Sequence, residues 1–274
     1  MEDVDLERFA TVGLQFPRSP VREGYFTSDD SRLYFASFGT GNPLLLLHGG
    51  MGNGTNWAAQ IETLVSAGYN PIVLDTRGHG RSSAGSKTFS YRLFCEDVSR
   101  LMDHLGLKEG ILIGWSDGAC TALEMARTKP SRVVGVVFFA CNVDPTGTRE
   151  FAMTKAISNC LRRHRIDFDR MTPTLERFEE LQPKLELMQK NEPNYSQTEL
   201  GSISVPVAVI QGESDEFIES SHSEYIAASL PNSYFETMEG LGHFAPIQDP
   251  DEFNRVIVKY VRMIEANHLT SSST

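Results

Sequence analysis

Cysteine is scarce in this sequence, and the few cysteines are far apart. The 274 residues include four of them and no Cys-x-x-Cys pair: Cys95, Cys120, Cys141 and Cys160. A disulfide framework and a zinc site both need cysteines at closer spacing, so neither is expected in a chain of this length. We therefore expect reduced thiols in a reducing compartment.

Long apolar runs and an excess of basic residues are also missing. The most apolar run covers residues 133–141 and falls far short of the ~20 residues that span a bilayer. The N-terminal segment is acidic and has no apolar stretch, so we expect no secretory signal and a cytoplasmic protein. The 25 Lys and Arg residues stand against 36 Asp and Glu, a net charge of −11. Neither a membrane nor a nucleic acid is an expected partner.

Short apolar runs alternate with helix-length amphipathic segments along most of the chain. The runs expected to form strands are residues 21–26, 33–38, 44–47, 71–74, 110–113, 133–140, 205–210 and 233–238, the first two as a hairpin. The segments expected to form helices are 55–67, 91–105, 118–128, 219–230 and 249–266. Continuous apolar runs are typical of strands buried on both faces. The pattern predicts an α/β fold: a mostly parallel sheet of about eight strands with helices on both faces.

Residues 142–204 interrupt this alternation. They contain no strand-like run, and their two helical candidates are 147–163 and 173–191. We interpret the segment as a helical lid, inserted after the sixth strand, over the edge of the sheet where ligands bind. The predicted domains are a core, residues 1–141 and 205–274, and a lid insertion, residues 142–204. The tail after residue 266 is expected to fray.

One pentapeptide indicates a catalytic nucleophile. Residues 114–118 read Gly-Trp-Ser-Asp-Gly, with a predicted strand before them and a predicted helix after them. In a G-x-S-x-G turn of this kind the central serine, here Ser116, is exposed on a sharp strand-to-helix bend. The flanking Gly114 and Gly118 are needed there because side chains would clash with the neighbouring strand and helix.

A serine nucleophile needs a base that is oriented by an acid, and two later strand ends supply both. Glu213 and Asp215 follow the predicted strand 205–210, and His243 follows the last one. The order Ser116, acid, histidine is the order expected along such a chain. We predict Asp215 as the acid rather than Glu213, because it lies further into the loop beyond the strand.

These residues resemble the α/β-hydrolase superfamily, and the resemblance extends over about residues 21–266. It includes the turn His-Gly-Gly-Met-Gly at 48–52 and the segment 75–82, which we interpret as structural. In such proteins the turn supplies one backbone N–H of the oxyanion hole, here Gly50 or Met51, and the residue after the nucleophile supplies the second, here Asp117. Two preorganised donors of this kind stabilise the charge that develops on the carbonyl oxygen.

Within the superfamily, the elbow looks like that of biphenyl-hydrolase-like and valacyclovir-hydrolase-type esterases. In that group the Asp after the serine is associated with recognition of a substrate ammonium, which makes Asp117 and its neighbour Trp115 candidate substrate contacts. A carboxylate at the start of a helix is also favoured by the helix dipole, whatever the substrate. Both interpretations of Asp117 stay open at this stage.

The sequence thus predicts a serine hydrolase that cleaves small to medium carboxylic esters through an acyl-enzyme, with Ser116, His243 and Asp215 as its triad. No cofactor and no metal is implied, since no metal-binding motif is present. The alternatives are a lactonase, a C–C bond hydrolase or a perhydrolase on the same fold, or a triad-bearing small-ligand receptor with slow turnover. The oligomeric state is open.

Overall fold

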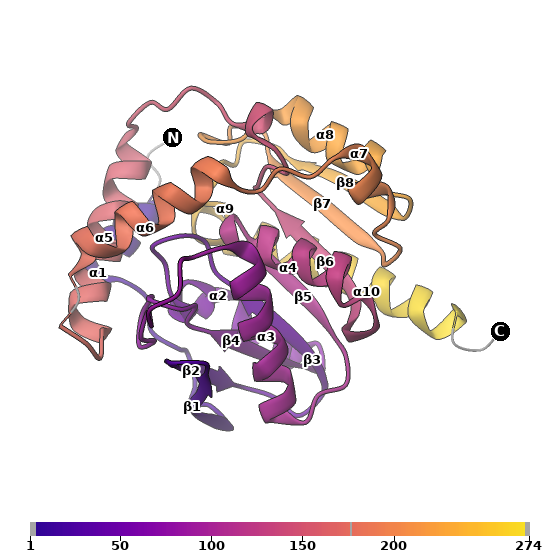
Figure 1. Cartoon of the computed structure of the whole chain (residues 1–274). Coiled ribbons are helices and arrows are strands. Elements are labelled where there is room, and N and C mark those ends of the chain that lie inside the picture. Colours follow the sequence, from indigo (N-terminus) through magenta and orange to yellow (C-terminus); the bar gives the residue numbers. More distant parts are fainter. Residues whose placement is uncertain (1–3, 176, 272–274) are drawn as a thin grey trace.

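Eight strands form one sheet in this computed structural model, which describes residues 4–175 and 177–271. The spatial order of the strands is β1-β2-β4-β3-β5-β6-β7-β8 (Figure 1). Their bounds are β1 Arg22–Ser28, β2 Ser31–Ser37, β3 Asn42–Leu47, β4 Tyr69–Leu74, β5 Gly110–Trp115, β6 Val133–Phe139, β7 Val207–Gly212 and β8 Ser233–Met238. β2 runs antiparallel to both β1 and β4, and every other neighbouring pair is parallel. The mostly parallel sheet predicted from the sequence is confirmed.

Helices follow the strands along the chain. The α-helices are α1 Val4–Val12, α2 Ala58–Ser66, α3 Tyr91–Leu105, α4 Asp117–Thr128, α5 Lys155–Met171, α6 Phe178–Asn191, α7 Gln197–Gly201, α8 Ser220–Ser229, α9 Ala245–Gln248 and α10 Pro250–Ser271. Short 3₁₀ turns lie at η1 Gly54–Trp57, η2 Pro130–Arg132 and η3 Pro145–Gly147. Within the described ranges, no helix combines the length and apolar character that crossing a membrane requires.

The alternate side chains of the strands enter two separate hydrophobic cores. On β3, Leu45 and Leu47 join one core together with residues of α3 and α4. Leu44 and Leu46 join the other core, together with residues of α2 and α10. All four leucines are at most 2% exposed. Because both faces of the sheet are covered, the sequence of β3 is a continuous apolar run and does not alternate with polar residues.

The insertion between β6 and β7, residues 142–204, differs in detail from the prediction. Its first helix, α5, begins at Lys155 and not at 147, because the Thr154 hydroxyl caps it by accepting the Ile157 N–H. The second helix, α6, begins at Phe178 and not at 173, and the short helix α7 was not predicted. In Figure 1, α5 lies at the left edge of the molecule and α6 runs from it toward the centre.

The structure adds a helix at the N-terminal end of the described chain and extends the helix predicted at 249–266. α1 packs against α5, so the N-terminal segment contacts the insertion. α10 continues to Ser271, and the expected fraying from residue 267 is wrong as far as 271. Residues 272–274 of that tail lie outside the described residues.

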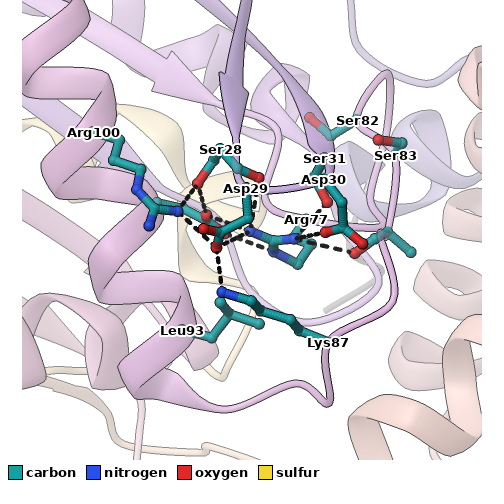
Figure 2. Close-up of polar contacts among 12 residues, drawn as sticks. Ser28, Asp29, Asp30, Ser31, Arg77, Ser82, Ser83, Lys87, Leu93 and Arg100 are labelled. Atoms are coloured by element: carbon teal, nitrogen blue, oxygen red, sulfur yellow. Dashed lines mark hydrogen bonds and ion pairs between the residues drawn. The ribbon is translucent and has the colours of Figure 1, made fainter.

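A buried ion-pair cluster holds the β1–β2 hairpin in place (Figure 2). Arg77, in the segment after β4, is completely buried and donates to both carboxylate oxygens of Asp97 on α3, at 2.7 and 3.0 Å. It also pairs with Asp29 and Asp30 of the hairpin turn. Arg100 on α3 lies 2.7 Å from Asp29. These contacts tie the segment 75–82 to the hairpin and to α3, as a structural role requires.

Candidate active site

Ser116 occupies a strained turn between a strand and a helix. β5 ends at Trp115, α4 begins at Asp117, and Ser116 between them has φ 55° and ψ −124°. A left-handed φ of this kind is unfavourable for any residue other than glycine, so the surroundings must hold it. One such contact is the Ser116 N–H, which donates to the carbonyl of Phe139 on β6 at 2.9 Å. Ser116 is half-buried, between two buried neighbours.

The two glycines of the pentapeptide are required by close backbone contacts. A Cβ on Gly114 would clash with the backbone of Gly118 and Ala119 at the start of α4. A Cβ on Gly118 would clash with the carbonyl of Leu47 at the end of β3. The helix therefore packs against strand backbone at the bend, which is the constraint expected of a sharp strand-to-helix turn.

Asp215 and His243 form a hydrogen-bonded pair beyond the ends of β7 and β8. His243 Nδ1 lies 3.0 Å from Oδ2 and 3.2 Å from Oδ1 of Asp215. The Asp215 Oδ1 also accepts the backbone N–H groups of Phe217 and Ile218, at 2.8 and 2.9 Å. Glu213 is exposed and accepts the N–H of Gly240 instead.

The electrostatics of this pair favour an ionised Asp215 and a basic His243. Burial by itself would raise the pKa of Asp215, but His243 and the two backbone N–H groups outweigh burial and lower it. Burial would likewise lower the pKa of His243, but Asp215 raises it above the ordinary value. The net effect is a carboxylate that orients the imidazole and stabilises its protonated form.

Aromatic rings surround the imidazole of His243. Phe217 lies edge-on to it, with ring centroids 4.6 Å apart, and Phe244 and Trp115 lie at 5.5 and 6.3 Å. Trp115 itself is 3% exposed and also packs against Phe244. Within the described part of the chain, the Ser116 side chain makes no hydrogen bond that caps α4.

The turn after β3 lies beside Ser116 and is held by His48. A Cβ on Gly49 would lie 3.1 Å from the Cβ of Ser116, so the turn and the serine are in close contact. His48 Nε2 accepts the N–H of Thr76 at 3.0 Å, which leaves Nδ1–H to donate to the Gly49 carbonyl at 2.7 Å. Burial lowers the pKa of His48 to about 4, so it holds the turn as a neutral ring. Met51, in the same turn, has a left-handed φ of 63°.

Asp117 is the centre of a hydrogen-bond network that joins three elements. Its side chain is buried, and Oδ1 accepts the Tyr91 hydroxyl of α3 at 2.7 Å. Gln189 of α6 donates its amide to Oδ2 at 3.0 Å and to Oδ1 at 3.2 Å. A Cβ on Gly50 would clash with Oδ2, so the carboxylate lies directly against the turn after β3. Burial raises the pKa of Asp117 despite the two donors.

The insertion contacts this network through hydrogen bonds and packs on the core through apolar side chains. Besides Gln189, the Glu192 carboxylate accepts the backbone N–H of Tyr91 at 2.9 Å. Leu185 and Met188 of α6 are buried in the core that also contains α3 and α4. A small cavity of about 10 Å³ lies against Gly50 and Asp117, and its lining includes neither Ser116 nor His243. Cavities of about 440 and 530 Å³ lie elsewhere on the molecule.

Sequence reasoning named the serine, the acid, the histidine and the glycine turn, but missed several residues around them. Tyr91, Gln189 and Glu192 come from distant segments, and no motif in the sequence marks them. Phe217 lies two residues after Asp215, but no motif marks it either. Among the residues that the structure describes, no group of three or more His, Cys, Asp or Glu side chains is placed to hold a metal ion.

One family model and two known proteins are described here as similar to this chain in sequence. A family model described as alpha/beta hydrolase fold matches residues 42–154. The serine hydrolase BPHL of Mus musculus is 26% identical over 243 residues, 84% of this chain and 83% of the mouse protein. A putative non-heme chloroperoxidase of Synechocystis is 40% identical over 98 residues, 36% of each chain. The match with the Synechocystis protein therefore spans about a third of the length of that protein.

Solved structures share the fold over most of the chain. A thermophilic esterase from Thermogutta terrifontis aligns with a TM-score of 0.68 at 25% identity, covering 89% of this chain and 99% of the esterase. An enol-lactonase from Burkholderia xenovorans LB400 aligns with a TM-score of 0.73 at 17% identity, covering 87% of this chain and all of the lactonase.

Proposed function

We propose that this chain, which belongs to the α/β-hydrolase superfamily and is a hydrolase, cleaves carboxylic esters of small to medium size through an acyl-enzyme. The observation that carries the proposal is the Asp215–His243 pair at the strand ends, whose imidazole lies 6.3 Å from the ring of Trp115, the residue directly before the strained Ser116. A buried carboxylate on Nδ1 of an imidazole is the arrangement that lets its Nε2 act as a general base.

In this mechanism Ser116 attacks the ester carbonyl while His243 takes its proton. His243 then protonates the departing alcohol, and a water molecule cleaves the acyl-enzyme with the same histidine as base. Asp215 holds the imidazole through Nδ1 and stabilises its cation. The oxyanion is assigned to the N–H of Asp117, the first residue of α4, and to that of Gly50 or Met51.

Covalent labelling tests the nucleophile. Treatment with a fluorophosphonate should add one adduct to the intact mass, and peptide mapping should place it on Ser116. Ser116→Ala should abolish the adduct, whereas Ser220→Ala, at an exposed serine, should leave it unchanged. The proposal fails if the parent protein stays unlabelled while a control esterase is labelled fully.

Asp117 is proposed to contact the substrate as well as to supply its N–H. An ammonium group on the substrate would have to compete with Tyr91 and Gln189 for the carboxylate. If Asp117 selects ammonium groups, α-amino esters should exceed their N-acetylated counterparts in kcat/KM, and Asp117→Asn should remove the difference. If the parent protein hydrolyses both kinds of ester at equal rates, the role of Asp117 is limited to the start of α4 and to its hydrogen bonds with Tyr91 and Gln189.

The contact of the insertion with the elbow favours a second candidate, a triad-bearing small-ligand receptor with slow turnover. The supporting observation is the hydrogen bond from Gln189 of α6 to the Asp117 carboxylate. Steady-state hydrolysis of short p-nitrophenyl esters and lactones separates the two candidates. Multiple turnovers support the hydrolase and rank its substrates, whereas a single burst with a large rise in melting temperature supports the receptor.

A further inference from the structure

Two of the cysteines lie in direct contact, although neither their spacing nor any motif suggests it. Cys120 belongs to the first turn and a half of α4, four residues after Ser116, and Cys141 follows β6 at the start of the insertion. Their Sγ atoms are 2.8 Å apart. Both side chains are buried, at 0% and 4% exposure.

We propose that Cys120 and Cys141 form a disulfide bond under oxidising conditions, and that this bond joins the nucleophile's helix to the entrance of the insertion. A disulfide is about 2.05 Å long, so the sulfurs need to approach by less than about 1 Å. α4 packs directly against β6, so the two side chains already face one another across a rigid contact.

The oxidant class that balances this reaction is a hydroperoxide. One thiolate attacks the O–O bond of hydrogen peroxide, which yields a sulfenic acid and, after protonation, water. The second sulfur then displaces the sulfenic oxygen as a second molecule of water, forming the S–S bond. Burial raises the pKa of the Cys120 thiol, so the thiolate is scarce and the reaction is slow compared with that of exposed thiols.

The other described cysteines, Cys95 and Cys160, provide internal controls, because they lie in other parts of the two cores. The Cys95 thiol contacts Met125 and Thr128, and Cys160 lies on α5 in the other core. The proposed bond closes the loop 120–141 and so restricts the unfolded chain, which stabilises the folded state. It does not depend on whether the protein hydrolyses esters.

Counting free thiols tests the proposal. The native protein is exposed to hydrogen peroxide, quenched with catalase, denatured and alkylated with iodoacetamide. Of the four cysteines, all should be alkylated before oxidation and after treatment with dithiothreitol, but only Cys95 and Cys160 after oxidation alone. Peptide mapping should show a peptide linking Cys120 to Cys141, and the melting temperature should rise by about 5 °C or more.

Variants separate this outcome from general oxidation. Cys95→Ala should still form the bond, whereas Cys141→Ala should keep its three remaining thiols alkylatable; Cys120→Ala serves if Cys141→Ala does not fold. The proposal is overturned if all four thiols of the parent stay free at peroxide exposures that oxidise the denatured chain. It is equally overturned if the linked peptide contains Cys95 or Cys160.

Discussion

Among the groups that raise the pKa of His243, Asp215 contributes most. The His243 imidazole is buried among aromatic rings, which favours the neutral form, yet Asp215 raises its pKa above the ordinary value. The same contact lowers the pKa of Asp215. A base that is too readily protonated is inactive at low pH, so the pair sets the acidic limit of the proposed activity.

The pH profile of hydrolysis should report this pair. We expect kcat/KM to fall as the pH drops below the raised pKa of His243. Asp215→Asn should move that limb to lower pH, because the attraction that raises the pKa is lost, and should lower kcat by about 10⁴-fold. Glu213→Gln, at the exposed acid of the same loop, should change neither. An unshifted limb in Asp215→Asn would contradict the assignment.

The Asp215–His243 pair should also make the stability of the folded protein depend on pH, in a direction that follows from the two pKa shifts. A raised histidine pKa adds stability that is complete below its unfolded value of about 6.5 and is lost as pH rises through the folded value. A lowered aspartate pKa adds stability above about 3.9 that is lost on acidification. The melting temperature of the parent should therefore exceed that of Asp215→Asn most between about pH 4 and 6.5. A constant difference across pH would contradict this.

Close packing at the bend makes Gly118 intolerant of any side chain. A Cβ there meets the Leu47 carbonyl, which cannot move without disturbing β3. We expect Gly118→Ala to lower the free energy of unfolding by ~3 kcal/mol or more. Gly201→Ala, at a helical glycine whose Cβ would meet nothing within 4 Å, should be neutral or stabilising by up to ~1 kcal/mol. Urea unfolding of both variants measures the contrast, and equal losses would be inconsistent with it.

At the scale of elements, the placement of α6 depends on few polar contacts with the core. Gln189 reaches from an exposed position to the buried Asp117 carboxylate, and Glu192 reaches the backbone of Tyr91. Apolar contacts of α6 with the core supply the rest. Elements held in this way are candidates for opening, and opening is needed for a substrate to enter.

Removal of the Gln189 amide should loosen α6. Gln189→Leu leaves Asp117 with one fewer donor, so we expect a loss of about 1 kcal/mol in the free energy of unfolding. Hydrogen exchange of α6 amides should become faster. Gln182→Leu, the same change on the same helix at an amide that donates to Glu186, is the matched control. If both variants exchange α6 amides alike, the Asp117 contact does not hold the helix.

At the scale of the whole molecule, the hairpin β1–β2 depends on the cluster around Arg77. The arginine is fully buried, and its loss would leave the Asp97 carboxylate buried without its partner. Burial already raises the pKa of Asp97, which shows how poorly the site would hold an unpaired charge. The cluster therefore connects the edge of the sheet to α3 and to the segment before it (Figure 2).

Two arginine variants should differ sharply in stability. Arg77→Met should cost about 3–5 kcal/mol in the free energy of unfolding, because it leaves a buried charge uncompensated. Arg18→Met removes an exposed pair with Glu62 and should cost no more than ~1 kcal/mol. Urea titration of each variant gives both values, and comparable costs would show that the cluster is not a stabilising one.

The sequence by itself determined the eight strands in chain order, most of the longer helices, and the positions of Ser116, Asp215 and His243 at strand ends. These follow from local patterns: apolar runs, glycines at a bend and polar residues after strands. The bounds of α5 and α6 were less accurate, since caps such as Thr154 and packing on the core decide them.

Only the tertiary structure decided which distant side chains meet. Nothing local joins Gln189 to Asp117, or Cys120 to Cys141, because each pair depends on how the insertion and β6 pack against α4. The same holds for Arg77 and Asp97. Such contacts arise from three-dimensional packing between segments far apart in the chain, whereas periodicity and turn chemistry are properties of neighbouring residues.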